Sequence, residues 1–271
     1  MEPPVWLSKA TQNVAEQVIY WRRHGLASAT NLLFPPQCPI SGEPVARHGT
    51  LAPAAWQQLT LLGAPWCEGC GLPFSDASKG PLCGACAAPS SFSGSLVGPR
   101  RLDGFRSAIA YDDEAARAIL ALKYADRHDG VAAFGALMAK VAHDLQPAEG
   151  DVVAIPVPLH RGRLRKRRYN QAGLLASALA DHLEIPVEHL VLKRTRPTPS
   201  QKGASATKRA RNVAGAFAVT DSARVANTHI LLVDDVLTTG ATLLACARSL
   251  RKAGAASVSG LTLARVLRDA P

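Results

Sequence analysis

Residues 229–242, with the sequence HILLVDDVLTTGAT, constrain the fold of this 271-residue chain more than any other stretch. The nearly continuous apolar run 229–233 is typical of a strand that is buried on both faces of a parallel sheet. Asp234 and Asp235 follow this run, and a short loop then leads into a predicted helix over 240–253. Ligands of open α/β sheets bind at the carboxyl ends of strands, so we expect the two acids and the loop to belong to a binding site.

The loop after these acids has the composition of a phosphate site. Threonine hydroxyls and backbone N–H groups at a helix N-terminus bind phosphate, aided by the helix dipole. Two adjacent carboxylates would repel a bare phosphate, but they could accept hydrogen bonds from the hydroxyls of a ribose 5-phosphate. The alternative interpretation, a turn with an Asp N-cap, does not explain two acids after an apolar strand. The stretch contains neither a Walker A loop nor a GxGxxG fingerprint.

The C-terminal two thirds of the chain alternate between predicted strands and predicted helices. The strands are expected over 105–111, 151–157, 187–192, 229–233 and 257–263, and the helices over 113–124, 131–145, 169–183 and 240–253. This alternation predicts an α/β fold with an open, mostly parallel sheet and helices on both faces.

Composition divides the chain into three parts. Residues 1–34 have loosely helical apolar spacing and are predicted to form a helical extension. Residues 35–99 hold five of the six cysteines and many of the prolines and glycines. A segment this poor in apolar residues needs a cross-link or a metal to fold. Residues 100–271 form the predicted α/β domain.

Four of the cysteines make two CxxC pairs separated by twelve residues: Cys67, Cys70, Cys83 and Cys86. Two such turns supply the four thiolates of a tetrahedral Zn²⁺ site. A redox CxxC is the alternative, disfavoured because two pairs occur together and neither follows a strand in a βαβ unit. Four thiolates leave no open coordination position, so the predicted zinc is structural. Cys38, paired only with Ser41, and Cys246, in an apolar helix, are expected outside the site.

Positive charge is concentrated in two short segments. The chain has 31 Lys and Arg against 21 Asp and Glu, a formal net charge of +10. Six of these cations lie in 161–168 and seven in 193–211, with no acid in either segment; without those thirteen, 18 basic residues face 21 acidic ones. Such segments suit a polyanion such as phosphate, pyrophosphate or nucleic acid. The alternative is a solvated surface.

The sequence predicts a soluble, cytoplasmic protein without membrane insertion. No apolar run approaches the roughly 18 residues that a membrane-spanning helix needs. The first residues, MEPP, lack the basic start and apolar stretch of a signal peptide.

Several motifs together carry a family resemblance. The strand, the two acids and the T-T-G-x-T loop at 229–242 resemble the phosphoribosyl pyrophosphate (PRPP) motif of type I phosphoribosyltransferases. IPVPL at 155–159, RRYNQ at 167–171 and the stretch 198–217 resemble the ComF family of competence-associated proteins. That family joins an N-terminal zinc ribbon to a phosphoribosyltransferase domain. The resemblance covers about 35–267, and it departs at Cys38–Ser41, where many members carry a further CxxC.

The resemblance implies roles for individual residues. Asp234 and Asp235 would be the catalytic pair that binds the ribose hydroxyls. The 5-phosphate would be bound by Thr238, Thr239, Gly240 and Thr242. The pyrophosphate and a lid over 196–212 would involve Pro158, His160, Arg161, Lys202 and Arg211. Mg²⁺ would enter with PRPP.

Two functions follow, from different classes. The first is an enzyme that displaces pyrophosphate from C1 of PRPP. The second is a non-catalytic competence protein that binds single-stranded DNA and uses PRPP as an effector, with a DNA-translocating helicase as a candidate partner. The candidate nucleic-acid residues are Arg165, Lys166, Arg167 and Arg168. Aromatic residues make up only 5% of the chain, which is little for a base-stacking platform.

Overall fold

The computed structural model describes residues 35–267, except 77, 79, 89–94, 99–100, 125–129, 146, 148 and 198–210. It also leaves the side chains of 121, 123, 124 and 166 undescribed. The predicted extension 1–34 and most of the predicted lid therefore lie outside the described residues.

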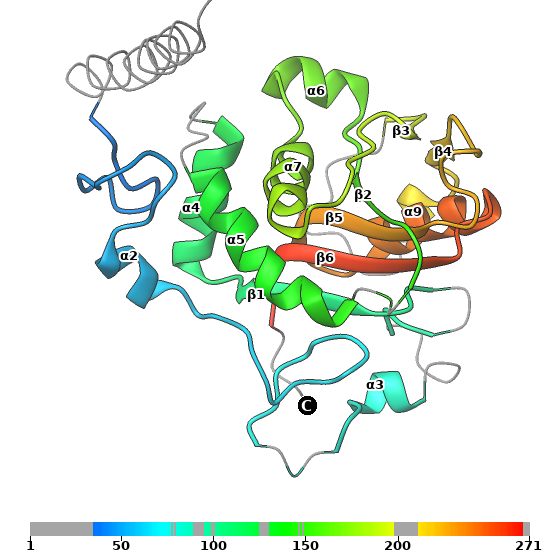
Figure 1. Cartoon of the computed structure of the whole chain (residues 1–271), viewed down its shortest axis with the longest axis horizontal. Helices are drawn as coiled ribbons and strands as arrows, with labels where there is room; N and C mark the ends of the chain where they lie inside the picture. The colour runs from blue at the N-terminus through cyan, green and yellow to red at the C-terminus, as the bar shows by residue number, and fades with distance from the viewer. Residues whose placement is uncertain are drawn as a thin grey trace, which may run out of the picture.

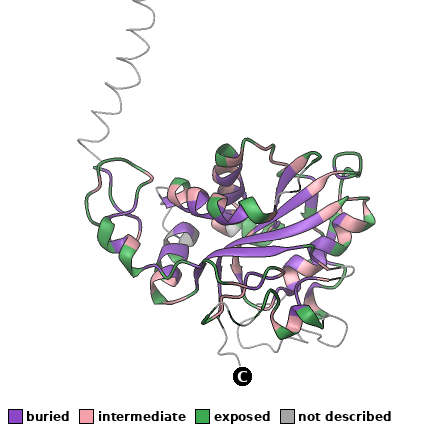
Figure 2. Ribbon diagram, turned by 60° about the horizontal axis from the view of Figure 1, so that its bottom comes forward, coloured by how far each residue is buried: buried purple, intermediate pink, exposed green. Residues whose placement is uncertain are grey.

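Four parallel strands form the central sheet, in the order β1–β6–β5–β2 (Figure 1). The strands are β1 (Phe105–Ala110), β2 (Val152–Pro156), β5 (His229–Leu237) and β6 (Ser257–Arg265). Their residues are almost all buried, and Figure 2 shows the sheet as the buried centre of the molecule. The predicted open parallel sheet is confirmed.

Helices cover both faces of this sheet. The long ones are α4 (Asp113–Tyr124), α5 (Val131–Ala142), α7 (Gln171–Leu183) and α9 (Ala241–Lys252). Alternate residues of β5 point to opposite faces: Leu231 and Val233 share a core with α4, α5 and α7, whereas Ile230 and Leu232 share one with α9. Among the described residues, none of the helices combines the length and apolar composition that a membrane crossing needs.

The short elements correct three predictions. They are α2 (Pro53–Gln58), α3 (Gly84–Ala87), η3 (His143–Leu145), α6 (Arg161–Arg167), β3 (Leu192–Arg194) and β4 (Phe217–Val219). The predicted helix over 131–145 ends at Ala142 and continues as η3. The predicted strand over 187–192 is wrong: Val187 makes one bridge to β2, and β3 pairs with β4 outside the main sheet. The basic run after residue 160, which none of the predicted helices includes, is largely the helix α6.

The cysteine-rich segment runs along the free edge of β1 (cyan in Figure 1). The Leu62 amide donates to the Ala108 carbonyl at 2.9 Å, and the Phe105 amide donates to the Gly69 carbonyl at 2.9 Å. Exposed strand edges are prone to pair with other chains, and this segment occupies the edge instead. The segment 35–99 therefore shares hydrogen bonds and core with the sheet.

Helices α5 and α7 pack too closely to accept a methyl group at Gly135. A Cβ there would lie 2.6 Å from the Cβ of Ala178, whereas a Cβ at Gly173 would find its nearest neighbour at 3.5 Å. Alanine adds up to about 1 kcal/mol of helix propensity at either position, but overpacking costs about 1–3 kcal/mol. We expect Gly135→Ala to lower the free energy of unfolding in urea and Gly173→Ala to preserve or raise it. Equal effects of the two substitutions would contradict this packing.

Candidate binding pocket and zinc site

The four paired cysteines meet at one point. The sulfurs of Cys67, Cys70, Cys83 and Cys86 all lie within 4.8 Å of one another. The Sγ atoms of Cys70 and Cys83 are 3.7 Å apart, close to the roughly 3.8 Å between ligands of a tetrahedral zinc ion with Zn–S bonds of about 2.3 Å. The Cys83 amide also donates to the Cys67 sulfur at 3.3 Å. The donor set and its spacing therefore fit structural zinc.

The protein surroundings already favour a thiolate at one of these sulfurs. A hydrogen bond from Cys86, supported by the positive charge of Arg265, lowers the pKa of Cys70 to about 5. The same hydrogen bond raises the pKa of Cys86, and burial raises the pKa of Cys83. Zinc binds thiolates, so binding would release protons from the sulfurs that are still protonated.

Residues 38–44 repeat the backbone of the knuckle at 67–73. In both segments the amide of the first cysteine donates to the carbonyl five residues later, and a glycine amide donates back to the carbonyl of that cysteine. This glycine has a positive φ in each segment. The Cys38 sulfur is buried and accepts from the Ser41 amide at 3.5 Å. The two segments share the sequence pattern C-x-x-[S/C]-G-x-P, which extends the resemblance beyond the cysteine and serine positions.

The second candidate site is a cavity of about 190 Å³ at the carboxyl ends of β2 and β5. It brings together four of the predicted ligand residues: Asp234, Asp235, Thr242 and Pro158. The remaining lining comes from Val157, Leu159, Arg163, Arg167, Asn170, Gln171, Ala172 and Arg194.

The two acids reach the cavity because β5 is longer than β2. The last pair between these strands joins Pro156 to Val233, but β5 continues along β6 through Leu237. The strand β5 is thus four residues longer than predicted, and Asp234 and Asp235 lie within it. They lie beyond the last residue that pairs with β2. The Asp235 amide donates to Oδ1 of Asp234 at 2.9 Å, which orients that carboxylate.

Three arginines line the same cavity from two other elements. Arg163 and Arg167 lie on α6, and Arg194 ends β3. Burial, followed by the charge of Arg163, lowers the pKa of Arg194. Guanidinium groups collected in one cavity, opposite two carboxylates, are suited to a ligand that carries both anionic groups and hydroxyls.

Gln171 adds a buried donor to this cavity. Its side chain is 3% exposed, and its Oε1 accepts from Arg167 at 3.3 Å. Its Nε2 has no hydrogen-bond partner among the residues that the structure describes. A buried amide without a partner is costly unless a ligand or water accepts from it. Asn170 is already engaged, because its Nδ2 donates to the Val157 carbonyl at 3.0 Å.

The other predicted site residues lie outside the lining of the cavity. Thr238, Thr239 and Gly240 form the adjoining turn into α9; His160 caps α6 by accepting from the Gly162 amide at 3.2 Å; Arg161, Arg165, Arg168 and Arg211 are exposed. Lys202 and the side chain of Lys166 fall outside the described part of the chain. Gly240 has a φ of +74°, and a Cβ there would lie 2.0 Å from Cδ2 of Leu96.

Sequence reasoning missed four polar residues of this lining: Arg163, Asn170, Gln171 and Arg194. One signal was available, because Arg163 and Arg167 are four residues apart and so share a helix face. The sequence analysis treated the basic run as a single charged segment instead. No local pattern marks Arg194, which reaches the cavity through the β3–β4 pairing.

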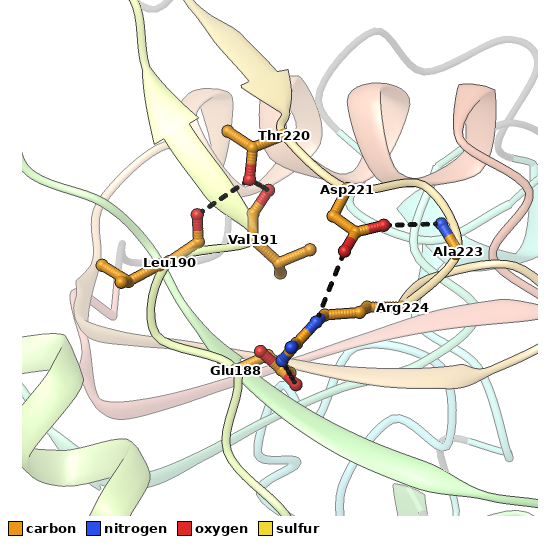
Figure 3. A network of polar contacts seen from close by, with 7 residues as sticks. All are labelled: Glu188, Leu190, Val191, Thr220, Asp221, Ala223 and Arg224. Atoms are coloured by element: carbon orange, nitrogen blue, oxygen red, sulfur yellow. Dashed lines mark hydrogen bonds and ion pairs between the residues drawn. The ribbon is translucent and has the colours of Figure 1, made fainter.

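A second cavity, of about 400 Å³, is lined by residues around β3, including both acidic and basic side chains. Arg224 pairs with Glu188 at 2.6 Å and with Asp221 at 3.4 Å (Figure 3). The Thr220 hydroxyl donates to the Leu190 carbonyl at 3.0 Å. This network joins the loop before β3 to the turn after β4, and its one arginine pairs with two carboxylates.

Comparisons with known proteins assign a domain family to each of the two parts of the chain. Residues 29–87 match the double zinc ribbon domain family, and residues 170–270 match the phosphoribosyl transferase domain family. Competence protein F of Haemophilus influenzae is 40% identical over 128 residues, which cover 47% of this chain and 55% of that protein. DNA utilization protein YhgH of Salmonella typhimurium is 31% identical over 207 residues, 74% of this chain and 84% of that protein. This chain thus spans about half the length of competence protein F and of a YhgH protein from Escherichia coli.

Among solved structures, a hypoxanthine phosphoribosyltransferase from Staphylococcus aureus superposes with a TM-score of 0.33 at 16% identity. The match covers 51% of this chain and 64% of that one. The superposition is partial. The class of the α/β domain is therefore taken from the domain-family matches and from the parallel sheet.

The parallel sheet and the four-cysteine cluster define a phosphoribosyltransferase-type domain preceded by a zinc ribbon. The chain belongs to the ComF family of competence-associated proteins, together with competence protein F and YhgH.

The zinc site can be tested by comparing two buried cysteines. We expect one zinc per chain in the purified protein, and Cys67→Ser should lower this content sharply because it removes a ligand. Cys38→Ser should retain the zinc, since Cys38 is buried elsewhere. Elemental analysis measures both variants, and zinc-free wild-type protein after purification in zinc-replete buffer would refute the site.

Proposed function

We propose that this protein binds PRPP with Mg²⁺ in the cavity at the ends of β2 and β5. The observation that carries the proposal is the meeting of two carboxylates, Asp234 and Asp235, with three arginines in one cavity. PRPP presents ribose hydroxyls, which can donate hydrogen bonds to carboxylates. It also presents phosphate groups, which guanidinium groups bind.

The cavity suggests how PRPP would be oriented. Asp234 and Asp235 would accept from the ribose hydroxyls, and the turn before α9 would hold the 5-phosphate with its backbone N–H groups. The pyrophosphate would then lie toward Arg163, Arg167 and Arg194. Mg²⁺ prefers oxygen ligands and usually bridges phosphates, and the two acids are the carboxylates in this cavity that could assist it.

The proposed reaction is displacement at C1 of the ribose. A nucleophile would form a bond to C1 as the bond from C1 to the pyrophosphate oxygen breaks and pyrophosphate leaves with that electron pair. Negative charge then develops on the leaving group, where the arginines would stabilise it, and Mg²⁺ when bound supplies further charge neutralisation. The acceptor nucleophile and a catalytic base are left unassigned.

Hydrogen bonds join the described residues at the two ends of the segment predicted to form a lid. The Thr195 amide donates to the Ala216 carbonyl at 2.9 Å, and Arg196 donates to the Ala214 carbonyl. The β3–β4 pair therefore holds the two ends of the second basic segment next to Arg194, which lines the cavity. A loop anchored here could close over bound PRPP and exclude water.

The names of the relatives support a cellular role in DNA uptake or DNA handling. A reducing, cytoplasmic location suits a protein in which none of the six cysteines forms a disulfide. A second candidate function, binding of single-stranded DNA, is favoured by the exposed cations of the first basic segment. Arg161, Arg165 and Arg168 are exposed and lie outside the cavity lining, whereas Arg163, also exposed, and the partly buried Arg167 line the cavity. A DNA-translocating helicase remains the predicted partner for that role.

PRPP binding is expected to stabilise the protein against heat. At a hundredfold excess over Kd, a ligand contributes about 2.7 kcal/mol to the folded state. We expect millimolar PRPP with Mg²⁺ to raise the Tm of the wild type, and Asp234→Asn combined with Asp235→Asn to remove most of that rise. Asp221→Asn, in the other cavity, is the matched control and should respond as the wild type does. An unchanged wild-type Tm would contradict the proposal.

DNA binding and PRPP binding are expected to depend on different cations of the first basic segment. Replacing Arg161, Arg165 and Arg168 with Gln should weaken single-stranded DNA binding and flatten the slope of log K against log salt by about 2, at about 0.7 per phosphate contact. PRPP stabilisation should survive this change. Replacing Arg163 and Arg167 with Gln should reduce PRPP stabilisation instead. A triple variant with wild-type DNA affinity and salt slope would exclude the exposed cations as the DNA surface.

A further inference from the structure

We propose that Arg106 and Arg265 are positioning residues of the zinc site. From the neighbouring strands β1 and β6 they hold the first knuckle, residues 67–71, on the edge of the sheet. Zinc binding and the protection of this edge are then parts of one cooperative unit. Neither arginine is a zinc ligand, and each acts through the backbone of the knuckle.

Three successive carbonyls of the knuckle, those of residues 68, 69 and 70, accept hydrogen bonds from the sheet. Arg106 Nη1 donates to the first at 2.8 Å. The Phe105 amide donates to the second at 2.9 Å. Arg265 Nη1 donates to the third at 2.7 Å. Three consecutive bonds fix both the position and the orientation of a turn that carries two of the four cysteine ligands.

Both arginines are deeply buried, with exposed fractions of 4% for Arg106 and 7% for Arg265. Their guanidinium groups lie against aromatic rings, Arg106 4.9 Å from the ring centre of Trp66 and Arg265 5.8 Å from that of Phe105. Buried cations need compensating charge. Among the described residues, the ion-pair partner of Arg106 is the half-exposed Asp144, whose Oδ2 lies 3.8 Å from Nε of Arg106.

A zinc ion bound by four thiolates supplies that compensation. Four thiolates and one Zn²⁺ carry a net double negative charge. The two buried guanidiniums next to the knuckle carry an equal and opposite charge. The arginines therefore stabilise the loaded site by charge as well as by hydrogen bonds, in the way that groups around a metal commonly tune its ligands.

The close approach of knuckle and sheet depends on Gly71. This residue has a φ of +61°, and a Cβ there would lie 2.9 Å from the carbonyl oxygen of Phe105. A side chain would push the knuckle away from the strand edge and break the three hydrogen bonds. The contact is thus specified by the sequence on both sides, by a glycine in the knuckle and by an arginine in each strand.

Coupling of this kind is reciprocal: what the sheet adds to zinc affinity, zinc adds to the stability of the β1 edge. The first experiment measures the rate at which full-length protein transfers zinc to a chromophoric chelator. Arg265→Leu and Arg106→Leu should each release zinc at least tenfold faster than the wild type, which corresponds to about 1.4 kcal/mol. Arg265→Lys, which keeps a donor and the charge, should recover part of the loss.

Arg224→Leu is the matched control, because Arg224 pairs with Glu188 away from the zinc site. The absorption spectrum of the Co²⁺-substituted protein gives a second readout, since its thiolate charge-transfer bands report ligand geometry. We expect these bands to shift in the Arg265→Leu protein and to match the wild type in the control. Equal zinc release by folded Arg265→Leu and Arg224→Leu would overturn the proposal.

Hydrogen exchange of the wild-type protein tests the coupling from the other side, even if the leucine variants fail to fold. Removal of zinc with a chelator should speed exchange of the Phe105 amide, which donates to the knuckle. Amides inside α7, on the opposite face of the sheet, should keep their protection. Unchanged protection of Phe105 after zinc loss would also overturn the proposal.

Discussion

The pairing of β5 with β6 beyond the end of β2 is the constraint from which the candidate ligand site follows. Hydrogen bonds to β6 keep residues 234–237 in a strand, while β2 has already turned away at Pro156. The space that β2 vacates becomes the cavity, with Asp234 and Asp235 on one wall. The segment after β2 contains α6, which adds Arg163 and Arg167 to the lining of the same cavity. The extra length of β5 and the position of α6 together bring opposite charges into one cavity.

The outer edge of the same sheet depends on the zinc ribbon. The cysteine-rich segment 35–99 contributes Cys67, Cys70 and Leu96 to the core that also contains the buried residues of α9. The side chain of Leu96 packs against Gly240, and Gly240 belongs to the turn that we propose binds the 5-phosphate. The ribbon and the phosphate turn are therefore in contact through one leucine and one glycine, and the metal site is part of the architecture around the cavity.

Local signals in the sequence predict much of this structure. Apolar runs identify β2 and β5, because strands buried on both faces need them. Paired CxxC spacing identifies the metal ligands, because tetrahedral coordination needs two tight turns. Tertiary contacts account for the rest. The four-residue extension of β5 depends on its neighbour β6, and the placement of Arg194 depends on the β3–β4 pair. Arg106 and Arg265 have no local feature that separates them from surface cations, and only the docked knuckle explains their burial.

A crystal structure of the full-length protein with PRPP and Mg²⁺ would test the proposed function most directly. The account predicts ribose hydroxyls within hydrogen-bonding distance of the Asp234 and Asp235 carboxylates. It also predicts pyrophosphate oxygens in contact with Arg163, Arg167 or Arg194. PRPP bound elsewhere, for example in the cavity beside Arg224, or an empty cavity at saturating PRPP, would contradict it.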